Sequence, residues 1–189
     1  MDRVPLVEFF IQSAERLQVS PIVKYSAFSF LADRFVPSLP TFIQADGTSS
    51  SSWLLRPVTQ STLQLFALIS LWISTKVLNF EIGTANIAFF FLEDLWVQFR
   101  GVAKVGELIS IEVCMDIMDL LYEKEDMSVH FRSPKSLAAS ILVTSYVITV
   151  PKQKWEFPVL AWVNFVTSCK EADITRLVTK ILKHVLRPS

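Results

Sequence analysis

The sequence predicts an all-helical protein. Glycine, the residue that the tight turns of antiparallel sheets need, occurs only 4 times in 189 residues. Apolar side chains recur with the period of an α-helix, as at Val4, Val7, Phe10 and Ala14 of the first segment. Hydrophobic residues make up 51% of the chain and charged residues 19%, which provides for a core and argues against general disorder. We therefore expect helices packed around apolar cores, in one domain or two small ones.

The first part of the chain contains three predicted helices. The first spans residues 4–17, and the second, residues 21–35, has Pro21 at its first position, where proline is well tolerated. A serine-rich tract at residues 46–52 predicts a surface loop. The third helix, residues 61–79, is apolar on nearly every side, which predicts a central helix enclosed by others.

The remainder of the chain predicts four further helices and one short turn. Thr84 can cap the first of these helices, and Asp173 can cap the last. Ser133 and Pro134 mark the start of another, because serine is a favoured N-cap and proline fits the first helical position. The expected ranges, in chain order, are 85–99, 107–122, 134–150, 158–168 for the turn and 173–186.

The charge balance and the cysteine content narrow the class of protein. Eighteen basic and eighteen acidic residues cancel, so the chain lacks the positive potential on which sequence-independent nucleic-acid binding depends. Cys114 and Cys169 are too few for a disulfide framework, and the acidic Asp2 and Glu8 lie where a secretory signal would be basic. We therefore expect no nucleic-acid partner and an intracellular location, nuclear or cytoplasmic.

A small membrane-embedded helical protein is an alternative, because the mean hydropathy is high at +0.42. Three stretches carry no charge, residues 57–75, 82–92 and 136–151. Only the first approaches the length of a membrane span, and polar residues reduce its apolar core to residues 65–73. A span requires roughly 20 predominantly apolar residues. Buried helices and no membrane partner are the preferred interpretation.

The sequence contains no pattern typical of a catalytic, cofactor or metal site. Its two histidines, His130 and His184, lack a cysteine or carboxylate at the spacing of metal ligands. Gly101 and Gly106 stand without the strand-to-helix setting of a phosphate-binding loop. We therefore expect a protein that is not an enzyme and binds no cofactor.

Several segments of the first part are similar to a known family. The chain opens with Arg3-Val-Pro-Leu-Val-Glu-Phe-Phe10, which resembles the start of a cyclin box. The second helix ends with Ala32-Asp33-Arg34-Phe35, similar to the Asp-Arg-Phe signature of the second cyclin-box helix. The third contains Leu63-Gln64-Leu65 and Ser74-Thr75-Lys76 in the order and spacing of a cyclin. The resemblance implies a cyclin fold, in which the third helix is the central one.

The resemblance continues through the second part and covers nearly the whole chain. Residues 78–83, Leu-Asn-Phe-Glu-Ile-Gly, resemble the junction between the two boxes of a cyclin. Tyr146-Val-Ile-Thr-Val-Pro-Lys-Gln153, followed by Trp155-Glu-Phe-Pro158, is most similar to the J-type cyclins of plants.

The resemblance also implies that part of the first box is missing. In cyclins a fourth and a fifth helix separate the lysine of the third helix from the junction, whereas Lys76 is followed here directly by Val77. Two helices, each of about a dozen residues, would then be absent, as in an alternatively spliced product. The expected domains are an incomplete first box, residues 1–79, and a complete second helical box, residues 80–189.

The family implies a regulatory subunit that binds a cyclin-dependent protein kinase in cell-cycle control. Lys76 matches a lysine that contacts the kinase, and its glutamate partner lies in the missing block, so we expect impaired kinase activation. Leu6 and Gln64 match a substrate-docking surface of the family. We expect docking there to be weak, because Phe9 stands at the position of the usual tryptophan of that surface. The alternative interpretation of Lys76 is a solvated charge at the end of a helix, and that of Gln64 is a buried structural amide. A DNA-binding transcription factor with a double cyclin fold is the alternative function.

The missing helices would leave apolar side chains of the third helix uncovered, which predicts possible self-association. The residues concerned are Leu65, Phe66, Leu68, Ile69, Leu71, Trp72 and Ile73.

In the family pattern, Asp33 and Arg34 lie at the end of the second helix and brace the first box. We expect Arg34→Ala to lower the free energy of unfolding by about 1 to 3 kcal/mol, because buried polar groups would lose their partner. Chemical denaturation followed by circular dichroism measures this change. A loss below about 0.5 kcal/mol would identify Arg34 as a surface residue.

Overall fold

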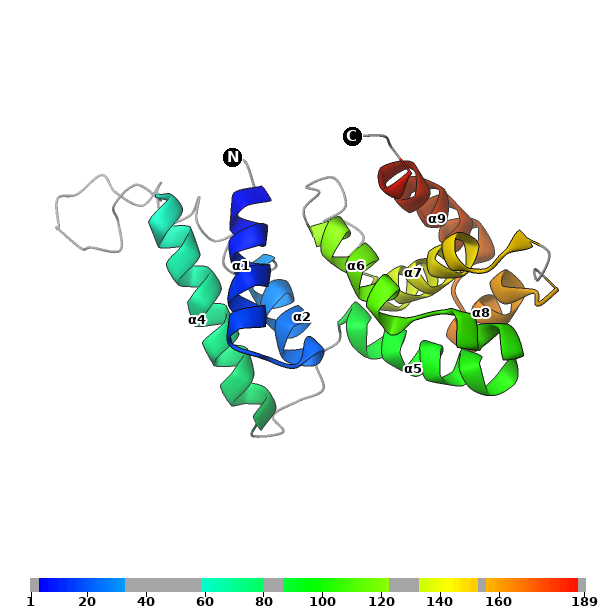
Figure 1. Cartoon of the computed structure of the whole chain (residues 1–189), viewed down its shortest axis with the longest axis horizontal. Coiled ribbons are helices and arrows are strands. Elements are labelled where there is room, and N and C mark those ends of the chain that lie inside the picture. The colour runs from blue at the N-terminus through cyan, green and yellow to red at the C-terminus, as the bar shows by residue number, and fades with distance from the viewer. Residues whose placement is uncertain (1–3, 33–58, 80–86, 123–132, 153–155, 187–189) are drawn as a thin grey trace, which may run out of the picture. The chain divides into compact units, whose positions relative to one another are not determined.

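The chain forms an all-helical structure. Every regular element within the described ranges is a helix, which confirms the predicted fold class (Figure 1). By its internal contacts the chain divides into two compact units, residues 1–85 and 86–189. The computed structural model describes residues 4–32, 59–79, 87–122, 133–152 and 156–186.

Three helices build the described part of the first unit. Helix α1 spans Val4–Arg16, α2 spans Pro21–Phe30 and α4 spans Gln60–Asn79. Each begins within one residue of the position expected from the sequence. The α4 helix packs against both α1 and α2, and the three lie side by side (Figure 1).

The core of this unit lies where the apolar faces of the three helices meet. Phe10 of α1 and Phe28 of α2 are buried, with their ring centroids 3.9 Å apart. Tyr25 of α2 is also fully buried. Each buried aromatic ring removes a large apolar area from water, so these three side chains contribute strongly to the core.

The α4 helix has one buried and one open face. Its buried side chains include three small ones, and small side chains let neighbouring helices approach closely. The Ser70 hydroxyl donates to the Phe66 carbonyl at 2.8 Å, so this buried polar group is satisfied within the helix. The expectation of a helix enclosed on all sides is wrong for the described residues, because α1 and α2 cover only one side. The buried residues are Leu63, Ala67, Ser70, Leu71 and Ser74.

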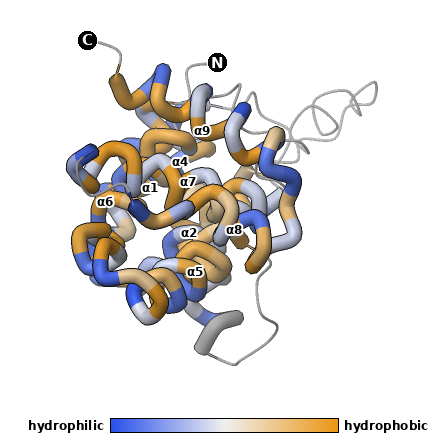
Figure 2. Tube along the Cα trace, turned by 90° about the vertical axis from the view of Figure 1, so that its right-hand side faces the viewer, coloured by the Kyte–Doolittle hydropathy of each residue, from blue (hydrophilic) through white to orange (hydrophobic). Residues whose placement is uncertain are grey.

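The second unit contains five α-helices and one short 3₁₀-helix within its described residues. Polar and apolar residues alternate along several of these helices (Figure 2). The central helix of the unit is α7, against which α5, α6, α8 and α9 all pack (Figure 1). The elements are α5 (Ala88–Val102), η3 (Lys104–Leu108), α6 (Ile111–Tyr122), α7 (Pro134–Thr149), α8 (Val159–Thr167) and α9 (Glu171–Val185).

The sequence-based boundaries were wrong at several places in this unit. Residues 158–168, expected as a turn, form the α8 helix, in which Val159 and Val163 are buried one turn apart. The helix ends at Thr167 and is followed by its C-cap Ser168, whose φ of 58° is left-handed. The α9 helix begins at Glu171, so Asp173 lies in its first turn instead of capping it. A carboxylate is also favourable there, because it faces the positive end of the helix dipole.

The predicted helix at residues 107–122 is divided into η3 and α6. The reason lies at Gly106, where a Cβ atom would stand 2.9 Å from the Arg100 Cα atom. The short helix therefore packs directly onto the backbone near the end of α5, which only glycine allows at this position. The Trp96 indole N–H of α5 donates to the Ile109 carbonyl at 2.8 Å and fixes the segment that leads into α6.

The α7 helix is buried without interruption over residues 137–146. Its Ser140 and Thr144 hydroxyls donate to the Ser136 and Ser140 carbonyls at 2.8 and 2.7 Å, which satisfies them inside the core. On α5, the Phe99 ring lies 6.0 Å from the Tyr146 ring between centroids. A helix covered in this way opens only when the surrounding unit opens.

We expect slower amide hydrogen exchange in residues 136–150 than in residues 4–31. The reason is that α7 has four covering helices, whereas α1 and α2 belong to a unit whose longest helix is covered on one side. Exchange followed by mass spectrometry of peptides from the intact chain measures the difference. Equal protection of the two segments would contradict it.

Candidate interaction surface

The uncovered side of α4 is an apolar surface. Leu65, Leu68 and Trp72 are 49%, 39% and 64% exposed, and Ile69 between them is partly exposed. Their spacing is i, i+3, i+4 and i+7, which places all four on one side of an α-helix. We call these four residues the open face of α4.

The open face contains fewer residues than the seven that the sequence predicted to be uncovered. Leu71, expected to be uncovered, is only 1% exposed, while Phe66 and Ile73 are partly exposed at the edges. The sequence carries a signal that separates the two sides, because Ala67 and Ser70 mark the side that neighbouring helices approach. With that signal, the helical period would have assigned Leu71 to the buried side.

The open face has an energetic cost. Its exposed side chains present on the order of 300 Å² of apolar surface, which is within the range of the largest patch on a typical monomer. At about 25 cal/mol per Å², covering that area is worth about 8 kcal/mol. This is comparable with the whole stability of a small domain. Such a surface marks a place where another element or molecule binds.

Lys76 stands at the end of the open face. It is exposed, lies in the last turn of α4 and follows Trp72 by four residues, so it shares the side of the helix that carries Trp72. A cation in this position is favourable, because it faces the negative end of the helix dipole. The surface thus combines an apolar stripe with a positive charge at one end.

The other predicted site residues lie on α1 and in the first half of α4. Leu6 is buried in the face of α1 that packs on its neighbours, while Phe9 and Gln64 are partly exposed on α1 and α4. Gln64 precedes Lys76 by 12 residues, or about 18 Å along the helix axis. The structure therefore does not bring Gln64 of the predicted docking surface together with the predicted kinase contact at Lys76.

Asp33 and Arg34 lie outside the described residues, as do Thr84 and His130. The predicted roles of Asp33 and Arg34 stay predictions. The predicted cap at Thr84 is wrong, because α5 begins at Ala88 and has Ile87 as its N-cap.

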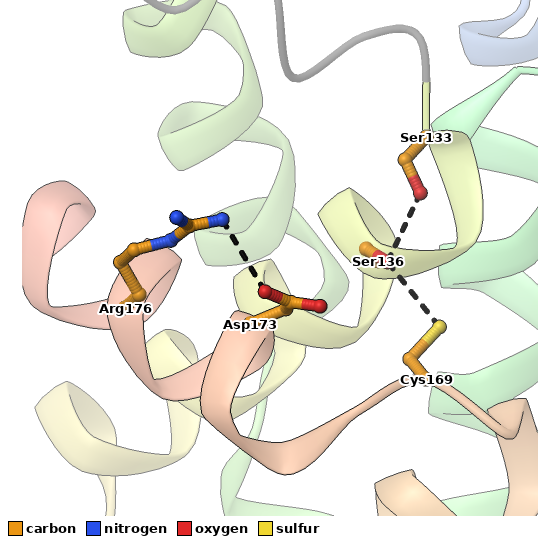
Figure 3. A network of polar contacts seen from close by, with 5 residues as sticks. All are labelled: Ser133, Ser136, Cys169, Asp173 and Arg176. Carbon is orange, nitrogen blue, oxygen red and sulfur yellow. Dashed lines mark hydrogen bonds and ion pairs between the residues drawn. The ribbon is translucent and has the colours of Figure 1, made fainter.

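In the second unit a polar network joins the start of α7 to the turn between α8 and α9 (Figure 3). The Ser133 hydroxyl donates to the Ser136 hydroxyl at 3.0 Å, which in turn donates to the Cys169 sulfur at 3.3 Å. The Asn164 amide donates to the Cys169 carbonyl at 2.6 Å. These bonds hold the turn against α7, and the hydroxyls have no base beside them within the network.

The other thiol, that of Cys114, is buried in the core of the second unit. Burial raises its pKa to about 11, so that it is protonated at neutral pH and is a poor nucleophile. Among the described residues, no three side chains of His, Cys, Asp or Glu are grouped so that they could hold a metal ion. Nor does any helix within the described ranges have the length and apolar character needed to cross a membrane.

The chain is similar to two curated proteins of plants. It is 50% identical to Cyclin-J18 of Arabidopsis thaliana over 220 residues, covering 96% of this chain and 93% of that protein. It is 43% identical to Cyclin-J18-like of Oryza sativa subsp. japonica over 226 residues, covering 97% of this chain and 87% of the relative. No family model matches the chain, and no solved structure is significantly similar to it.

These similarities define the class of protein to which the two helical units belong. The chain belongs to the cyclin family, and within it to the J-type cyclins known from plants. Both alignments, at 220 and 226 positions, are longer than the 189 residues of the chain. The relatives therefore carry residues that have no counterpart here.

The two faces of α4 can be tested with one matched pair of substitutions. We expect Leu71→Ala to lower the free energy of unfolding of the first unit by about 2 to 5 kcal/mol, because it leaves a cavity in the core. Leu68→Ala on the open face should cost less than about 1 kcal/mol. Urea denaturation followed by circular dichroism measures both, and equal losses would contradict the assignment of the faces.

Proposed function

We propose that this chain is a cyclin-like regulatory subunit that binds a cyclin-dependent protein kinase and regulates it in cell-cycle control. The observation that carries the proposal is the 50% identity to a cyclin over 96% of the chain. In this proposal the chain supplies no catalytic group, works without a cofactor, and acts in the nucleus or cytoplasm by presenting helical surfaces to its partner.

We assign the kinase contact to the end of α4 that carries Lys76. The exposure of Lys76 supports this assignment, because its ammonium group is accessible to a carboxylate on another protein. The exposed Trp72 beside it adds an aromatic anchor of the kind that dominates protein interfaces. Leu6, Phe9 and Gln64 are proposed as no more than a weak docking surface for substrates, since Leu6 is buried.

We further propose that the first cyclin box, residues 1–79, lacks two helices, whereas the second, residues 80–189, is complete. Two observations support this proposal. The open face of α4 is uncovered, whereas the central helix of the second unit, α7, is buried over residues 137–146. The alignments exceed the chain by about 30 positions or more, which is the size of two helices of about a dozen residues each with their connections. Kinase activation is then impaired, because the glutamate that accompanies the lysine in cyclins is missing.

The kinase contact is tested by co-purification with candidate cyclin-dependent kinases. We expect Lys76→Glu to weaken binding about tenfold, because the substitution reverses the charge that meets the kinase. Lys183→Glu, a reversal at an exposed lysine of α9, is the matched control and should leave binding unchanged. Equal effects of the two substitutions would contradict the assignment to Lys76.

Activation is tested separately, with a version of the chain that carries the relatives' additional residues after Lys76 as the positive control. The proposal expects this version to activate the kinase more strongly than the chain itself. Equal activation would contradict the incomplete first box, and binding of no kinase by either version would contradict the proposed function.

A further inference from the structure

The four residues of the open face are spaced symmetrically along α4. Leu65, Leu68, Ile69 and Trp72 are placed symmetrically about the midpoint between Leu68 and Ile69. An interface between identical copies related by a two-fold axis requires that residue i contacts residue j while j contacts i. Two α4 helices that cross antiparallel at this midpoint satisfy the requirement. Leu65 of each copy then meets Trp72 of the other, and Leu68 meets Ile69.

We propose that the open face is a self-association surface, on which α4 of a second copy of this chain packs antiparallel. The size of the side chains fits this pairing. A large aromatic ring faces a leucine at each end of the stripe, and two aliphatic side chains meet at its centre. Large and small groups that alternate across an interface interdigitate better than equal ones do.

The charge distribution of α4 is compatible with antiparallel pairing of two copies. Residues 60–75 of α4 carry no charged side chain, so the stripe presents no charge with which to select an acidic or basic partner. The charge that α4 carries is that of Lys76, which lies about 11 Å along the axis from the midpoint. Antiparallel pairing separates the two Lys76 side chains by about 22 Å, beyond the Debye length of about 8 Å in physiological salt. Parallel pairing would place them side by side.

Polar residues that flank the open face would also lie opposite each other in the antiparallel pair. Ser61 and Lys76 are equally distant from the midpoint, and both are exposed. In the antiparallel pair the Lys76 ammonium of one copy lies beside Ser61 of the other, whose hydroxyl oxygen can accept its hydrogen bond. The apolar centre thus has a polar group at each edge, as protein interfaces generally do.

The area sets the strength of the association. About 300 Å² of apolar surface from each copy, or about 600 Å² for the pair, is well below the lower limit of about 1,200 Å² for a stable interface. The lost translational and rotational freedom of the two chains also offsets much of the gain from covering this surface. The dimer is therefore weak and depends on concentration. Its existence does not depend on the proposed kinase contact, and its test uses the purified chain alone.

Sedimentation equilibrium of the intact chain over about 1 to 200 μM tests the proposal. We expect the apparent mass to rise from 21.5 kDa toward twice that value. Trp72→Glu should lower the association constant about tenfold or more, because it places a charge where the aromatic ring packs against Leu65 of the other copy. Phe165→Glu is the matched control, because Phe165 is 83% exposed on α8 and its substitution changes aromatic content and charge equally. It should leave the association constant unchanged.

Disulfide cross-linking tests the direction of the pairing, in a Cys169→Ser background so that the accessible native thiol does not interfere. We expect a mixture of the Leu65→Cys and Trp72→Cys chains to cross-link, and neither chain to cross-link with itself. Self-cross-linking of each chain would indicate parallel pairing and overturn the proposal. A monomer at every concentration would also overturn it, as would a dimer that persists in Trp72→Glu or is lost in Phe165→Glu. Circular dichroism of each variant verifies that it is folded.

Discussion

A helix that is apolar on nearly every side needs other elements to cover it, and this constraint governs both units. The α7 helix meets it, because α5, α6, α8 and α9 surround it and its Ser140 and Thr144 hydroxyls donate to carbonyls of the helix itself. The α4 helix is also largely apolar but has only α1 and α2 as close neighbours among the described residues. The α7 helix is therefore the centre of a closed core, whereas α4 leaves an apolar face in contact with water.

The same contrast links the structure of the first unit to its function. Covering the open face is worth several kcal/mol, so any molecule that binds there contributes to the stability of the unit as well as to an interface. Lys76 at one end adds a charge that a kinase could contact, whereas the symmetric apolar spacing fits a second copy. The two partners would use overlapping parts of one helix, so that self-association would compete with kinase binding.

Much of this architecture could be predicted from the sequence, because helical periodicity and proline positions are local signals. Pro21 and Pro134 each stand at the first position of a helix, as expected. The α8 helix was missed, since a nine-residue apolar segment has too few turns to show a period, and its burial against α7 comes from tertiary contacts. The burial of Leu71 was missed for a related reason: apolarity alone does not identify which side of a helix its neighbours occupy.

The central claim is that the open face of α4 exists because the first unit lacks covering helices. Fluorescence of a dye that binds exposed apolar surface tests it directly, measured on the chain and on a version with the relatives' additional residues inserted after Lys76. The account predicts strong fluorescence for the chain and a large decrease for the extended version. Weak fluorescence for the chain, or equal fluorescence for both, would contradict it.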